Sequence, residues 1–74
     1  MDVNNLIGMA NQIGEFFESM PDRKQAVEDI ATHIKRFWAP RMRHAILESI
    51  DQKTAEGLSP IVRDAIESHR QLLA

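Results

Sequence analysis

The chain has 74 residues, no cysteine and a formal net charge of -2. A chain of this length has room for one hydrophobic core, so we expect a single domain over residues 1–74. The absence of cysteine excludes disulfides and thiolate metal sites. The first residues do not resemble a signal peptide, and no apolar run approaches the ~20 residues that span a bilayer, so we expect a cytoplasmic protein that contacts no membrane.

Charge is unevenly distributed along the chain. Residues 31–46 contain no acidic residue but include four basic ones, so this stretch carries +4 and the remainder -6: Lys35, Arg36, Arg41 and Arg43. A local basic surface on an acidic chain predicts one complementary partner more than general binding to polyanions. We therefore expect no nucleic-acid partner, although arginines that open a helix after Pro40 leave a small DNA-binding regulator as a third alternative.

The first helix is predicted over residues 3–18. Its apolar residues follow the spacing of one helical face: Leu6, Met9, Ala10, Ile13, Phe16, Phe17 and Met20. Gly8 and Gly14 lie off this face, and each costs about 1 kcal/mol relative to alanine in a helix. The helix therefore depends on tertiary packing, and Gly14 allows another backbone to approach closely. Pro21 ends the helix.

Two further helices are predicted before residue 51. Asp22 is an N-cap with Gln25 in the capping-box position. The apolar face of the second helix comprises Ala26, Val27, Ile30, Ala31, Ile34, Phe37 and Trp38. Pro40 closes this helix and lies in the first turn of the third. The third helix has an apolar face with Leu47 alongside it: Met42, Ala45, Ile46 and Ile50.

The last predicted helix runs from Ser59-Pro60 to the end of the chain. Gly57 breaks the preceding segment, the Ser59 hydroxyl caps the helix, and Pro60 lies in its first turn. Its apolar positions are Ile61, Val62, Ala65, Ile66, His69, Leu72 and Leu73. His69 falls within this periodicity and is expected to be partly buried. The sequence thus predicts an all-α fold, a small bundle of about four helices.

The segment from Phe37 to Arg43 concentrates the residue types that are enriched at protein interfaces. It contains the only tryptophan of the chain and supplies the predicted partner-binding residues: Phe37, Trp38, Pro40, Arg41, Met42 and Arg43. Phe37 continues the stripe of Ile30 and Ile34, which places it in the core, whereas Trp38 lies at the helix end, between core and partner. The arginines are expected to bind a carboxylate, phosphate or carbonyl of another chain, or to remain solvated.

We predict no catalytic, cofactor-binding or metal-binding residue. Asp29 with His33, and His44 with Glu48, have a spacing that suits two metal ligands, but a metal site would need the two pairs to converge, so a helix-surface hydrogen bond or ion pair is the favoured interpretation. The serines lack a nucleophile-elbow context, and no glycine-rich phosphate loop occurs. The functional side chains are concentrated in the segment Phe37–Arg43 and are of the types used in protein recognition, which indicates a binding subunit rather than an enzyme.

Four strings of the sequence, in this order and spacing, resemble the delta subunit of cytoplasmic NAD-dependent formate dehydrogenase. They are residues 9–17 (MANQIGEFF), 21–23 (PDR), 30–43 (IATHIKRFWAPRMR) and 57–60 (GLSP). The string Phe-Trp-x-Pro-Arg-Met-Arg is the most specific of them, and the resemblance covers nearly the whole chain.

The resemblance implies a non-catalytic accessory subunit of a molybdenum or tungsten enzyme. In that family the large subunits carry the bis-pterin metal cofactor, iron–sulfur clusters and flavin, and they oxidise formate while reducing NAD. The delta subunit is then expected to dock on the large catalytic subunit, to support its assembly or stability, and to bind no cofactor itself.

Two points stay open at this stage. A maturation factor would aid insertion of the bis-pterin cofactor through Lys35, Arg41 and Arg43 and would not be retained in the mature enzyme. An exposed apolar helix face would also allow the isolated chain to self-associate as a homo-oligomer.

Overall fold

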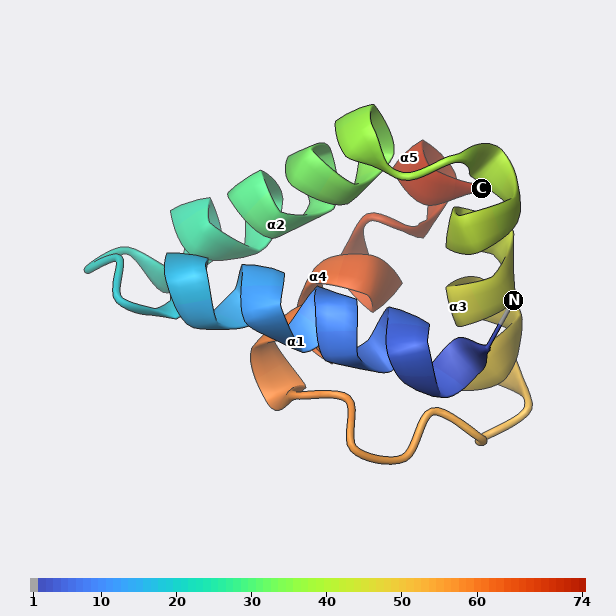
Figure 1. Ribbon diagram of the computed structural model, residues 1–74. Helices are drawn as coiled ribbons and strands as arrows, with labels where there is room; N and C mark the ends of the chain where they lie inside the picture. The colour runs from blue at the N-terminus through green and yellow to red at the C-terminus, as the bar shows by residue number, and fades with distance from the viewer. Residues whose placement is uncertain (1) are drawn as a thin grey trace.

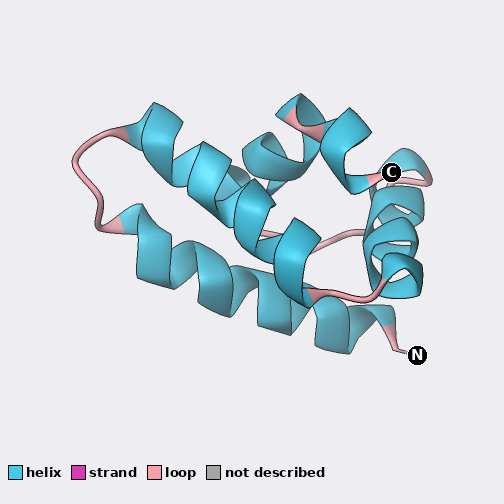
Figure 2. Cartoon of the chain, turned by 90° about the horizontal axis from the view of Figure 1, so that it is seen from above, coloured by secondary structure: helices cyan, strands magenta, loops and turns pink. Residues whose placement is uncertain are grey.

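The computed structural model describes residues 2–74 as helices joined by short turns, so the prediction of an all-α fold is confirmed (Figure 1). The elements are α1 (Val3–Glu18), α2 (Arg23–Phe37), α3 (Pro40–Asp51), α4 (Pro60–Ser68) and α5 (Arg70–Leu73). Helices α1 and α2 run antiparallel, α3 lies across one end of the pair, and α4 with α5 lies on one side of it (Figures 1 and 2). Across residues 2–74, no helix is both long and apolar enough to cross a membrane.

Buried apolar side chains from all five helices meet in one cluster. The largest side chains with almost no exposed surface come from α2 to α5 and are Ile30, Ile34, Ile46, Val62, Ile66 and Leu73. Helix α4 is deeply buried, since Val62, Ala65 and Ile66 all have 0% exposure. Because α4 packs against both α1 and α2, it holds the antiparallel pair together from one side.

Gly14 brings α1 and α4 into close contact. A Cβ atom at this position would lie only 2.5 Å from Cγ2 of Val62, so the close approach is made by a side chain of α4 and not by the backbone that was expected. The bounds predicted for α1 are confirmed, but its buried face is not the predicted stripe. The buried residues are Leu6, Ile7, Ala10 and Gly14.

Asn11 joins α1 to the segment that precedes α4. Its side-chain oxygen accepts a hydrogen bond from the Ser59 amide (2.8 Å), and its side-chain nitrogen donates to the Gly57 carbonyl (2.8 Å). The prediction that the Ser59 hydroxyl caps α4 was wrong, because it makes no capping bond and its oxygen is buried with no partner among the described residues. The Asn11 side chain therefore positions the start of α4 in place of a Ser59 cap.

Asp22 caps α2 as predicted. Its carboxylate accepts hydrogen bonds from the amides of Lys24 (3.0 Å) and Gln25 (3.3 Å). The Gln25 side chain does not return to Asp22 to complete a capping box but donates to Asp29 one turn further on (2.9 Å). Only half of the predicted capping motif is therefore formed.

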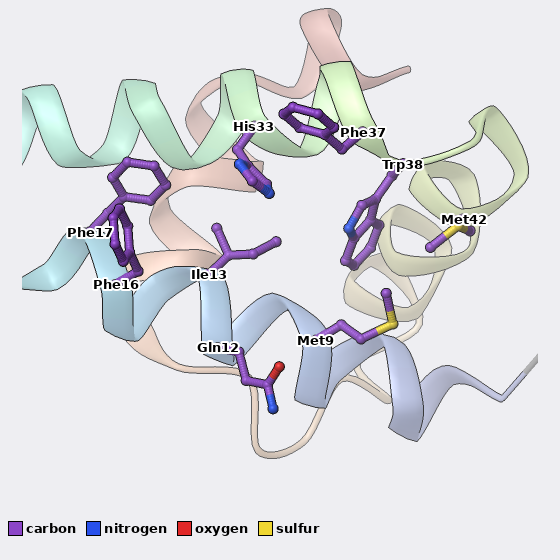
Figure 3. A pocket seen from close by; sticks show the side chains of 9 residues that line it. All are labelled: Met9, Gln12, Ile13, Phe16, Phe17, His33, Phe37, Trp38 and Met42. Atoms are coloured by element: carbon purple, nitrogen blue, oxygen red, sulfur yellow. The ribbon is translucent and has the colours of Figure 1, made fainter.

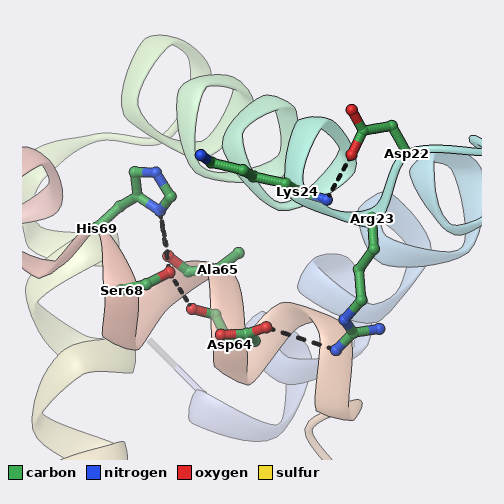
Figure 4. A network of polar contacts seen from close by, with 7 residues as sticks. All are labelled: Asp22, Arg23, Lys24, Asp64, Ala65, Ser68 and His69. Atoms are coloured by element: carbon green, nitrogen blue, oxygen red, sulfur yellow. Dashed lines mark hydrogen bonds and ion pairs between the residues drawn. The ribbon is translucent and has the colours of Figure 1, made fainter.

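The prediction of one helix from Pro60 to the chain end was wrong, because α4 ends at Ser68 and α5 follows after His69. The backbone of His69 leaves helical geometry (φ -118°, ψ 32°), and its half-buried ring lies with Nδ1 3.2 Å from the Ala65 carbonyl oxygen (Figure 4). The change of direction accompanies complete burial of Leu73.

The ion pair Arg23–Asp64 (3.5 Å), also drawn in Figure 4, joins two half-exposed side chains and contributes little to stability.

Replacement of the two α1 glycines by alanine should have opposite effects. Nothing lies within 4 Å of a Cβ at Gly8, so Gly8→Ala should raise the free energy of unfolding by about 1 kcal/mol through helix propensity. Gly14→Ala should lower it, because overlap with the fully buried Val62 costs about 1–3 kcal/mol and outweighs that gain. Urea denaturation of both variants measures the difference, and equal stabilisation by both would contradict the close packing of α1 on α4.

Candidate functional site

An apolar groove with a volume of about 560 Å³ lies between α1 and α2. In Figure 3 its side chains lie on the near side of the two helices, with α4 behind them. The groove is lined by Met9, Gln12, Ile13, Phe16, Phe17, His33, Phe37, Trp38 and Met42. Only Gln12 and His33 carry polar side-chain atoms other than the indole nitrogen, so the groove is suited to an apolar ligand surface.

Aromatic rings cross the groove from α1 to α2. Phe16 and Phe17 meet edge to face with ring centroids 5.0 Å apart, and Phe17 lies 6.2 Å from the ring of His33. His33 in turn lies 4.7 Å from the Phe37 ring. Yet Phe16 is 75% exposed and Phe37 69% exposed, so both ends of this row of rings are open to solvent.

The groove exists because α1 buries a different face from its apolar stripe. At 100° per residue, the centre of the buried face is rotated by roughly 75° from the centre of the predicted stripe. Met9 and Phe16, at the far edge of that stripe, are consequently exposed, at 43% and 75%. Sequence reasoning did not single out these two residues as part of a surface site. The available signal was an apolar stripe of seven residues, which is wider than the face that α1 buries.

Phe37 does not lie in the predicted core, whereas Trp38, which was predicted to lie between core and partner, is in the core. Trp38 is 6% exposed and belongs to the core, whereas Phe37 is 69% exposed on the groove. The reason is the register of α2, because Trp38 follows Ile34 at the i+4 spacing and continues the buried row that begins at Ile30. The placement of Phe37 in the core was therefore wrong.

Arg43 lies inside the protein with 8% exposure. Its guanidinium donates a hydrogen bond to the Lys35 carbonyl oxygen (3.0 Å). That carbonyl is in the last turn of α2, where backbone oxygens lack helical partners. The side chain therefore caps α2 from α3 and fixes the angle between these helices, a role that the sequence did not reveal.

Arg41 stands on the surface where the groove continues towards the start of α1. A second hollow, of about 630 Å³, is lined by Asp2, Asn5, Leu6, Met9, Arg41 and Met42. It adjoins the apolar groove because Met9 and Met42 line both. Pro40 begins α3 and is exposed. The structure thus brings Phe37, Trp38 and Met42 to the groove and Arg41 to its end.

The predicted carboxylate–histidine pairs are not formed among the described residues. Asp29 accepts from Gln25, and Glu48 accepts from Gln52 (3.1 Å). His33 lies instead between the rings of Phe17 and Phe37. Within residues 2–74, no group of three or more His, Asp or Glu side chains is placed to hold a metal ion.

The chain is a small all-α domain with an apolar groove exposed between α1 and α2. Residues 5–66 match the family model described as NADH-dependent formate dehydrogenase delta subunit FdsD. The chain therefore belongs to the family of formate dehydrogenase delta subunits, as the resemblance of its sequence strings indicated. Comparison with curated proteins gave no match, and comparison with solved structures gave none.

The two arginines of α3 should respond differently to replacement by methionine. Arg43→Met leaves the Lys35 carbonyl without its charged donor and should lower the free energy of unfolding by about 1–3 kcal/mol. Arg41→Met removes an exposed charge and should change it by less than about 0.5 kcal/mol. Thermal or urea unfolding of the two variants provides the comparison, and an unaffected Arg43→Met protein would show that the capping bond adds no stability.

Proposed function

We propose that this chain is a non-catalytic accessory subunit that docks on the large catalytic subunit of a NAD-dependent formate dehydrogenase and supports its assembly or stability. The observation that carries the proposal is the apolar groove, with Phe16 and Phe37 exposed on it. The chain belongs to the family of formate dehydrogenase delta subunits, so the partner in this proposal is the catalytic subunit of that enzyme.

The docking surface in this proposal comprises the groove and the segment Phe37–Arg43 beside it. Phe37, Met42 and Arg41 are placed to contact the partner. Trp38 and Arg43 are buried in the chain itself, and with Pro40 they set the direction of α3. A surface that is held in place in this way loses little conformational freedom on binding, which favours affinity.

The mechanism is linkage between binding and assembly. A chain that binds the assembled or cofactor-loaded catalytic subunit better than the empty one shifts the population towards the loaded state. In this proposal the bis-pterin metal group, the iron–sulfur clusters and the flavin belong to the other subunits. Burial of an exposed phenylalanine contributes roughly 1.5–3 kcal/mol, so the two exposed rings are the main source of affinity.

The alternative, a maturation factor that binds the anionic pterin cofactor through Lys35, Arg41 and Arg43, loses one of its three cations. The Arg43 guanidinium is buried and bonded to the Lys35 carbonyl, which leaves two basic side chains on the surface. Stoichiometry separates the two functions. An accessory subunit stays near one-to-one in purified enzyme that reduces NAD with formate, whereas a maturation factor accompanies only inactive, cofactor-free catalytic chain.

Phe37→Ala should weaken docking without unfolding the chain. Loss of this exposed ring should raise the Kd for the catalytic subunit about tenfold or more, since about 1.4 kcal/mol corresponds to a factor of ten. Affinity capture of the complex, followed by titration of the two purified proteins, gives the change. Leu72→Ala, at a 41% exposed position outside the groove, is the control and should bind like the unmodified chain. Equal binding by both variants would exclude the groove as the docking surface.

A further inference from the structure

We infer that the groove receives an amphipathic helix of the catalytic subunit that carries acidic side chains on the edge facing Arg41. The inference rests on the proposed function and specifies the secondary structure and the charge of the partner segment. Three properties of the groove lead to it: its apolar lining, the spacing of its side chains and the unpaired basic residues at its rim.

The apolar lining favours a helix over an extended segment. An extended segment leaves its own amide and carbonyl groups in need of partners, and burial of such groups without hydrogen bonds is costly. The groove offers few polar partners, and residues 2–74 contain no strand whose edge an extended peptide could join. A helix satisfies its backbone groups internally and presents only side chains to the groove.

The spacing of the groove residues matches that of helical side chains. Met9 and Phe16 on α1 are seven residues apart, which corresponds to about 10 Å of helix. A partner helix that inserts apolar side chains at positions i, i+3 or i+4, and i+7 covers the same length. The groove therefore accommodates about two turns of helix between the walls that α1 and α2 form.

The rim of the groove is positively charged on the side of α2 and α3. Arg36 and Arg41 are exposed, and the two ion pairs found among residues 2–74, Arg23–Asp64 and Arg70–Asp51, involve neither of them. The guanidinium of Arg36 lies 6.0 Å from the centre of the Phe37 ring, beside the groove. Exposed cations around an apolar surface fit a partner with carboxylates at the edge of its apolar face.

One acidic residue, Asp2, lines the end of the groove with Arg41. Its carboxylate accepts the Asn4 amide (2.9 Å) as the N-cap of α1, and its single negative charge can offset only one of the two basic side chains. The same charges disfavour a second copy of this chain as the occupant. Two copies that pack groove to groove would bring their basic rims together, and like charges at an interface oppose association.

Charge reversal at matched helix positions tests the acidic edge. Arg41 and Lys24 each occupy the second position of a helix, α3 and α2 respectively, where a glutamate is compatible with the helix dipole. Arg41→Glu should raise the Kd for the purified catalytic subunit at least tenfold at low salt, and less at high salt, because screening weakens the repulsion. Lys24→Glu, away from the groove, should bind like the unmodified chain. Equal Kd values for both variants would overturn the acidic edge.

Photo-cross-linking in the intact complex tests the helix. With p-benzoylphenylalanine in place of Phe37, irradiation and mass spectrometry should identify one segment of the catalytic subunit with apolar residues at i, i+3 or i+4 and i+7 and at least one adjoining Asp or Glu. Cross-links to a segment without this spacing, or to a second copy of this chain, would overturn the inference while a stable complex upheld the proposed function. Failure of the unmodified chain to bind any catalytic subunit would overturn both.

Discussion

The contact of α4 with Gly14 on α1 decides which side of the helix pair is covered. Because Gly14 has no side chain, Val62 reaches the space that a Cβ would occupy, with only 2.5 Å between the two positions. Helix α4 therefore lies close against one side of the pair and buries Val62, Ala65 and Ile66 completely. Among residues 2–74 no helix covers the opposite side, and the apolar groove lies there (Figure 3). The core and the candidate site are consequences of the same packing choice.

The corner between α2 and α3 divides the aromatic and basic segment into an inner and an outer set. Trp38 enters the core and Arg43 caps α2 through the Lys35 carbonyl. Phe37 and Arg41, their neighbours in sequence, are thereby held on the surface. In the proposed docking, the inner residues fix where the outer ones stand, which lowers the conformational entropy lost when a partner binds.

A chain this small supplies little stability from its own core, commonly about 3–5 kcal/mol. Leaving two phenylalanines exposed forgoes part of the hydrophobic stabilisation that was available to it. This loss of stability is consistent with the proposal that these two rings become buried against another protein. Within the described residues, stability instead depends on close packing at Gly14 and on specific polar links such as the Asn11 side chain at the start of α4.

The amino-acid sequence by itself determined the helical class, the bounds of α1, the cap at Asp22 and the family, because helical periodicity, proline positions and local strings depend on neighbouring residues. It also directed attention to the segment Phe37–Arg43. Only the tertiary structure shows that Trp38 is buried while Phe37 is exposed. It also shows that the Arg43 side chain caps the end of α2 and that Met9 and Phe16 line the groove. Phe37 and Trp38 both fit the helical periodicity of α2. The apolar stripe of α1 is wider than the face that one neighbouring helix covers, so it is compatible with two packing arrangements. On α2 the row from Ile30 through Ile34 continues to Trp38, whereas on α1 the packing of α4 against Gly14 leaves Met9 and Phe16 exposed.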